Sequence, residues 1–169
     1  SHAAAYAVVS YQTAWLKTNH PLEFMAGVMN CDIHLTDKLS QYVDEIRKGL
    51  KLPFIPPCIN CSQPKFSVLE NSLIYGLAGL KNVGLEAMGV LVKARNTKVF
   101  VTLFDLSRRV DLRKIGKRPL EMLAQAGAFD VLDTNRHRVF KSLDSLVAYS
   151  AAIHDQKLSS QVSLFGEGG

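Results

Sequence analysis

The sequence has 169 residues, of which 47% are apolar, so it can bury the core of one large domain or of two small ones. Its formal net charge of +5 is compatible with an anionic partner but does not demand one. No apolar run is long enough to cross a bilayer, no signal peptide is recognisable, and the few cysteines favour a reducing cytoplasm. Since the first residues already predict a helix, we expect the chain to be part of a longer protein.

The first third of the chain predicts three helices. Residues 1–19 are apolar nearly all round, which is typical of a buried helix. Pro21 fits the first turn of a second helix. Thr36 is placed to cap a third helix, and Gly49 is placed to end it. The apolar stripe of this third helix consists of Leu39, Val43, Ile46 and Leu50.

Prolines interrupt this pattern, and a small hairpin follows them. The prolines between residues 53 and 57 favour an extended connection. Residues 65–77 contain two short β-prone runs around Glu70-Asn71, which predicts a β-hairpin. We therefore expect residues 1–63 to form a first, helical unit.

Short helices joined by tight turns are predicted from Gly79 onward. Their ranges are about 84–96, 102–109, 117–126 and 135–157. The last helix carries one buried stripe, formed by Val139, Leu143, Leu146, Ser150 and Ile153. The helical periodicity stops at Ser159. The expected units after the first are therefore 64–134, a long helix 135–158 and a flexible tail 159–169.

The segment Lys81-Asn82-Val83-Gly84 joins an apolar run to the start of a helix. Gly84 permits a backbone conformation that bulkier residues resist, and Val83 would plug the core. The free amides at the start of the helix would then point outward, where a phosphate can sit. This is the arrangement of a helix-hairpin-helix element, which binds a nucleic-acid backbone without reading bases. A plain turn between packed helices is the alternative.

Residues 107–130 repeat this plan, with Ile115-Gly116-Lys117-Arg118 as the turn and Pro119 near the start of the next helix. The cations of this stretch are Arg108, Arg109, Arg113, Lys114, Lys117 and Arg118, and Asp111 opposes them. A charge run is usually a solvated face, but this one lies at a turn that presents helix amides. Two such elements in tandem predict contact with both strands of double-stranded DNA.

The sequence resembles the alpha subunit of bacterial DNA polymerase III, the replicative C-family polymerase. The stretches that carry the resemblance are SHAAAYAVVSYQTAWLKTNHPLEFMA, PPCIN, YGLAGLKNVG and KRPLEMLAQAGAFD, which cover nearly the whole chain in the family's order. The resemblance implies that the first half is part of the polymerase fingers and that the second half is a tandem helix-hairpin-helix region. The expected fold class is mainly α: a helical fingers fragment, a small β-hairpin, then tandem helix-hairpin-helix motifs.

The resemblance also implies an activity that needs residues outside this chain. The family is a DNA-directed DNA polymerase that uses magnesium, and its palm carboxylates lie upstream of the matching segment. We therefore expect no cofactor in this chain and no nucleotide incorporation by it alone. Ser1, His2 and Tyr6 match family positions near the incoming nucleotide, although they could simply pack or cap the first helix. The residues expected to contact DNA are Lys81, Asn82, Gly84, Arg113, Lys114, Gly116, Lys117 and Arg118.

The last residues resemble the clamp-binding peptide of bacterial polymerases, which is a Gln, two variable residues and then Leu-Phe. Gln161, Leu164 and Phe165 match it, and the resemblance implies a sliding clamp as a partner, besides other replicase subunits in the parent protein. Leu164 and Phe165 can fill an apolar pocket, while Gln161 offers a donor and an acceptor at its edge. The glycines from Gly166 onward would let the segment extend. The alternative is that the pair folds back onto the chain's own core.

Three other interpretations compete with this one. Cys31 and His34, together with Cys58 and Cys61, have ligand types and spacings suitable for tetrahedral zinc, which would make the chain a structural zinc module. Small cysteines beside prolines and helix ends are otherwise ordinary apolar residues. The chain could also belong to the error-prone paralogue of the same family, or it could be a stand-alone helix-hairpin-helix DNA-binding adaptor.

Overall fold

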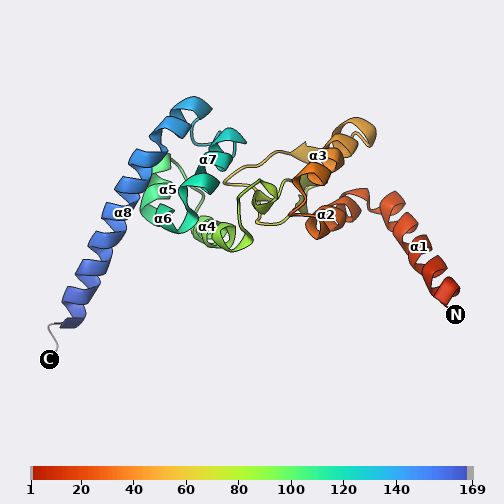
Figure 1. Cartoon of the computed structure of the whole chain (residues 1–169), viewed down its shortest axis with the longest axis horizontal. Helices are drawn as coiled ribbons and strands as arrows, with labels where there is room; N and C mark the ends of the chain where they lie inside the picture. Colours follow the sequence, from red (N-terminus) through yellow and green to blue (C-terminus); the bar gives the residue numbers. More distant parts are fainter. Residues whose placement is uncertain (1, 167–169) are drawn as a thin grey trace.

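The computed structural model describes residues 2–166, and their fold is mainly helical, as the sequence predicts. The α-helices of this part of the chain are α1 (His2–Asn19), α2 (Pro21–Cys31), α3 (Thr36–Asp44), α4 (Leu85–Thr97), α5 (Leu103–Arg109), α6 (Leu112–Ile115), α7 (Lys117–Gln125) and α8 (Arg136–Gly166). The molecule is elongated, and α1 and α8 project from its opposite ends (Figure 1). None of these helices is long and apolar enough to cross a membrane.

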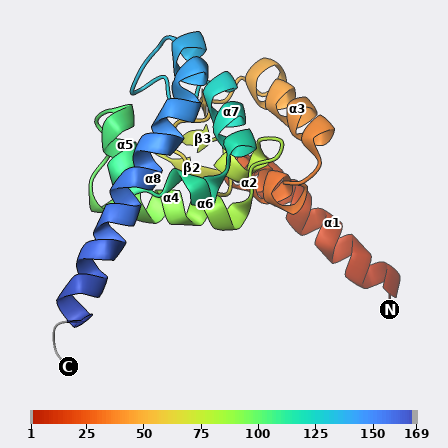
Figure 2. The same ribbon diagram turned by 60° about the vertical axis from the view of Figure 1, so that its left-hand side comes forward.

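The molecule is built around two apolar cores. In the first core, α2 and α3 pack against a small sheet; its buried side chains include Leu22, Met25, Met29, Leu39, Ile46, Phe66 and Leu73. In the second core, α4 to α8 pack together; its buried side chains include Met88, Leu91, Leu106, Leu120, Leu123, Phe129, Val139 and Leu143. α8 lies along α5, α6 and α7 (Figure 2), and the predicted stripe is buried at Val139, Leu143, Leu146 and Ser150, while Ile153 is only half-buried. Removal of this apolar surface from water stabilises each core.

The division between the two cores differs from the boundary expected after residue 63. Ile59 is fully buried in the second core, whereas Phe66 and Leu73 are buried in the first. The chain between α3 and α4 thus passes from the first core to the second and back before it enters α4. Proline-rich connections carry no periodicity, so the sequence does not reveal which core their apolar residues enter.

The predicted hairpin is present and gains a third strand. β2 (Ser67–Leu69) pairs antiparallel with β3 (Ser72–Ile74), and β1 (Phe54–Ile55) pairs parallel with β3, which is therefore the central strand. Glu70 and Asn71 form the turn with φ of 50° and 60°, as a two-residue primed turn requires. The sequence does not predict β1, because prolines flank this two-residue edge strand on both sides.

Gly76 lies where two backbone segments approach closely. A Cβ added there would meet the backbone carbon of Lys65 at 2.5 Å and the backbone nitrogen of Phe66 at 2.6 Å. We expect Gly76→Ala to lower the free energy of unfolding by roughly 1–3 kcal/mol, because neither backbone atom can move without disturbing the sheet. Urea denaturation checks this. Gly89→Ala in α4 is the control: it meets nothing within 4 Å and should raise stability by about 0.5–1 kcal/mol. An unchanged midpoint for Gly76→Ala would contradict the close approach.

The first helix is exposed, which contradicts the prediction that it is buried. No residue of α1 is buried, and Tyr6 and Tyr11 are 73% and 71% exposed. The helix meets the rest of the described chain where it turns into α2 and through an ion pair between Lys17 and Glu45. The helix is apolar, as its sequence shows, but no other part of residues 2–166 covers its apolar side chains.

Two predictions about the third helix need correction. Its N-cap residue is Leu35, so Thr36 is the first helical residue and makes no capping bond. The helix then continues as a π-helical turn, η1 (Glu45–Gly49), and the residue that turns into the left-handed region is Lys51, with φ of 50°, rather than Gly49. Glycine is the residue most often found in the left-handed conformation after a helix, but the geometry of the turn decides which residue adopts positive φ.

The last helix is longer than predicted. α8 reaches Gly166, so residues 159–166 are helical and not a flexible tail. No proline or glycine interrupts this stretch before Gly166, and its residues tolerate a helix that an upstream packed segment has already nucleated. Gly168 and Gly169 lie outside the described residues.

Candidate nucleic-acid interface

The first predicted hairpin turn connects the 3-10 turn η2 (Leu77–Gly79) to α4. Val83 is 6% exposed and belongs to the second core, which confirms its role as a plug. Lys81 and Asn82 are exposed beside it. The residue with positive φ is Asn82, at 64°, while Gly84 is extended at φ −91°. The backbone conformation at position 84 therefore does not require glycine. The space beside Gly84 is open, because an added Cβ would meet nothing within 4 Å.

The second turn runs from α6 through Gly116 into α7. Gly116 has φ of 95°, a conformation that side chains disfavour, so glycine is required here. Ile115 is buried and holds the turn against the second core. The short helix α6 was not predicted. Asp111 caps it, since its side chain accepts a hydrogen bond from the amide of Arg113.

The two turns meet on one side of the molecule. Gly84, Ala87 and Val90 of the first element and Lys114, Ile115 and Pro119 of the second line one hollow of about 500 Å³, together with Glu86. The sequence predicted each turn, but only the fold brings them together. An extended anionic ligand can thus contact both turns at once.

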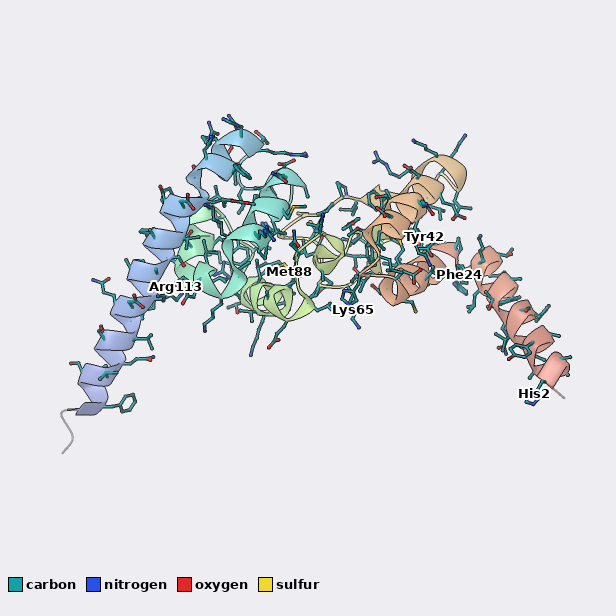
Figure 3. The ribbon with its side chains drawn as sticks, viewed as in Figure 1. His2, Phe24, Tyr42, Lys65, Met88 and Arg113 are labelled. Atoms are coloured by element: carbon teal, nitrogen blue, oxygen red, sulfur yellow. The ribbon has the colours of Figure 1, made fainter. Side chains whose placement is uncertain are left out.

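The cations around the second turn are not equivalent. Arg113 pairs with Asp111 and with Asp155 of α8, each at 3.0 Å, at the junction of α6 with α8 (Figure 3). Lys117 pairs with Asp144 of α8 at 3.0 Å. The Arg113 guanidinium holds the pKa of Asp111 below its ordinary value, and hydrogen bonding to Asp144 raises the pKa of Lys117. These two cations help to dock α8.

Arg109, which the sequence grouped with the same cations, is part of the fold. Its guanidinium stacks 4.6 Å from the Phe100 ring centroid and donates to the carbonyl oxygen of Ala94 at 2.6 Å. By contrast, Lys81, Lys114 and Arg118 are exposed and have no ion pair among residues 2–166. Arg108, from the same group of cations, is likewise exposed and has no ion pair among these residues, so all four side chains are available to an anionic ligand.

Arg95 of α4 and Asn60 of the proline-rich loop hold that loop in place, and the sequence did not predict either role. Arg95 is 6% exposed and donates to the carbonyl oxygens of Ile59, at 3.3 Å, and Ser62. The Asn60 side chain donates to the carbonyl oxygen of Phe100 and accepts from its amide, both at 2.9 Å. Arg95 follows Met88, Leu91 and Val92 at helical spacing, which was the available signal that it takes a core position.

The proposed zinc ligands do not form one site. Within residues 2–166 no three His, Cys, Asp or Glu side chains are grouped so that they could hold a metal ion, so the four candidates, Cys31, His34, Cys58 and Cys61, are not brought together. Cys58 and Cys61 instead bracket the turn that Arg95 holds, and burial raises the pKa of the Cys61 thiol. The same part of the chain does not gather the carboxylates that would bind the magnesium of a polymerase.

The remaining candidates lie at the two ends of the molecule. His2 and Tyr6 are exposed on α1, and His2 is at its free end (Figure 3), while Ser1 lies outside the described residues. Gln161, Leu164 and Phe165 lie on the last turns of α8, where Leu164 is 79% and Phe165 is 87% exposed. The alternative in which this pair folds back onto the core is not what the structure contains.

Comparison with known proteins agrees with this geometry. Residues 51–139 match the family model described as a helix-hairpin-helix motif. The chain is 42% identical over 167 residues to DNA polymerase III subunit alpha of Caulobacter vibrioides and 44% identical over 169 residues to that of Haemophilus influenzae. Each match covers 98% of this chain and 14% of the relative, so the chain spans about one seventh of the length of these relatives. It therefore belongs to the helix-hairpin-helix family and corresponds to a segment of the alpha subunit of bacterial DNA polymerase III.

Proposed function

We propose that this chain binds the backbone of duplex DNA without sequence preference, as part of a protein that carries out DNA-templated DNA synthesis with magnesium. The observation that carries the proposal is that both hairpin turns line one hollow, with Lys81, Lys114 and Arg118 free of ion pairs among the described residues. Exposed lysines and arginines beside turns neutralise phosphates and release counterions. Phosphate contacts of this kind fix position and carry no sequence information.

The helix termini add to this surface. The first amides of α4 and α7 have no acceptor within their own helices, and the positive ends of both helices lie at the turns. Gly84 leaves the first of these termini uncovered. A duplex can therefore approach the backbone closely at the first turn and find cations at both turns.

We expect the triple variant Lys81→Ala, Lys114→Ala, Arg118→Ala to bind duplex DNA more weakly and with less salt dependence. Each lost phosphate contact should reduce the slope of log K against log salt by about 0.9, hence by nearly 3 in total. Fluorescence anisotropy of a labelled duplex between low and moderate salt measures this. The weakening should be equal for duplexes of unrelated sequence.

Two controls make this experiment specific. Lys48→Ala, Lys51→Ala removes one cation from η1 and one just after it; neither lines the hollows at the turns, so the slope should be nearly unchanged. Arg113→Ala, Lys117→Ala removes two cations that α8 carboxylates already neutralise, and should reduce the slope less than Lys114→Ala, Arg118→Ala does. A wild-type slope in the triple variant would refute the proposed function.

We further propose that the end of α8 binds a sliding clamp through Gln161, Leu164 and Phe165. The exposure of Leu164 and Phe165 favours this role, because a large apolar pair that packs against nothing else is available to a partner. A stand-alone adaptor is less well supported, since the similarity to alpha subunits covers both halves of the chain and not only its hairpins.

A further inference from the structure

A second hollow adjoins the first hairpin turn. Its volume is about 430 Å³, and its walls come from the loop between α2 and α3 and from the turn itself. Ile33 and Val83 line it and are 4% and 6% exposed. Because Ile33 belongs to the first core and Val83 to the second, the hollow sits at the seam between the two cores.

The polar side chains of this hollow all carry hydrogen-bond donors. They are His34 from the α2–α3 loop, Thr36 from the first turn of α3, and Lys81 and Asn82 from the hairpin turn. None of the four side chains makes a hydrogen bond or an ion pair within residues 2–166, and all four are exposed. No carboxylate lines the hollow, whereas the hollow between the two turns includes Glu86. A hollow that is lined by hydrogen-bond donors and by no carboxylate favours an anionic ligand.

The position of the hollow connects it to the DNA-binding surface. Gly84 lines both hollows, so the two are adjacent and share a stretch of uncovered backbone. A duplex that contacts both hairpin turns across Gly84 would therefore pass over His34 and Thr36 as well. The α2–α3 loop lies next to the first helix-hairpin-helix turn because the segment that precedes α4 returns to the first core.

We propose that this second hollow holds a backbone phosphate of the duplex, and that His34 and Thr36 are DNA ligands contributed by the first core. This inference rests on the proposed function and extends its surface beyond the hairpins. His34 thereby acquires a role that needs no metal. This contact would also fix the orientation of the first core relative to the bound duplex.

The test compares His34→Ala, Thr36→Val with the unchanged chain in the same anisotropy titration. Loss of two hydrogen bonds to a charged phosphate should weaken duplex binding about tenfold or more. Thr36→Val alone should weaken binding without changing the salt slope, because the hydroxyl carries no charge, whereas Lys81→Ala should reduce the slope by about 0.9. Gln41→Ala, an exposed neutral change on the next turn of α3, is the matched control and should bind as the unchanged chain does.

The outcomes separate this inference from the proposed function. If the triple cation variant binds weakly but His34→Ala, Thr36→Val binds normally, the second hollow is not a phosphate site and only this inference fails. If neither variant weakens binding, the proposed function fails with it. Competition with dATP at constant ionic strength tests the phosphate source. If dATP binds the unchanged chain but not the double variant, and leaves the affinity for duplex unchanged, the hollow belongs to a free nucleotide and the inference is overturned.

Discussion

We expect the triple alanine variant of Gln161, Leu164 and Phe165 to bind the cognate sliding clamp at least about 100-fold more weakly than the unchanged chain. A buried aromatic and an aliphatic anchor supply most of the affinity of such short peptides, and here both side chains are free to enter a pocket. Surface plasmon resonance against immobilised clamp measures the effect. Equal affinity of the two chains would refute the clamp proposal.

The same variant must keep its fold if the proposal is correct. Leu164 and Phe165 are 79% and 87% exposed, so their truncation should leave the thermal midpoint nearly unchanged. A large loss of stability would identify the pair as core. Val162→Ala, Ser163→Ala is the matched control: it changes the two variable positions and should retain clamp binding, whereas loss of binding would indicate recognition of a helical face that includes Val162.

A further variant tests whether the clamp binds this segment as a helix or in extended form. Proline at position 163 would break the last turns of α8, where an interior proline costs about 3 kcal/mol of helix stability, but it would leave all three anchors in place. If the clamp takes the segment in extended form, Ser163→Pro should bind at least as tightly as the unchanged chain. If the clamp takes the helix, Ser163→Pro should lose binding.

Replacement of Arg95 by alanine is expected to lower the free energy of unfolding by about 2–4 kcal/mol. The substitution leaves the carbonyl oxygens of Ile59 and Ser62 without their donor and creates a cavity between α4 and the proline-rich loop. Since an entire domain is stabilised by only about 5–15 kcal/mol, this is a large effect. Urea denaturation followed by circular dichroism measures it.

Two companion variants identify the cause. Lys93→Ala removes an exposed cation from the same helix and should change stability by less than about 0.5 kcal/mol. Arg95→Met keeps much of the side-chain volume but none of the donors, so it should recover only the cavity part of the loss. A stability of Arg95→Ala equal to that of Lys93→Ala would show that Arg95 does not hold the loop.

The sequence determined the local structure wherever a periodic or conformational signal was strong. The stripe of α8, the plug at Val83 and the turn at Glu70-Asn71 were all predicted, because each depends on residues close together in the chain. The two hairpin turns were identified for the same reason. By contrast, the exposure of α1 could not be read from its apolar composition, since composition shows what a helix could bury but not what is present to cover it.

Only the tertiary structure decided which of these features work together. Arg113 and Asp155 are 42 residues apart, so no local sequence pattern could predict that they pair. Their ion pair distinguishes the cations that dock α8 from Lys114 and Arg118, which stay unpaired among the described residues. The placement of His34 and Asn82 in one hollow depends on the chain crossing between two cores. The sequence by itself thus determined most of the helices and both turns, because these arise from local spacing, and its resemblance to a known family indicated the family. The shared surface and the free charges arise from contacts between distant segments, and only packing fixes those.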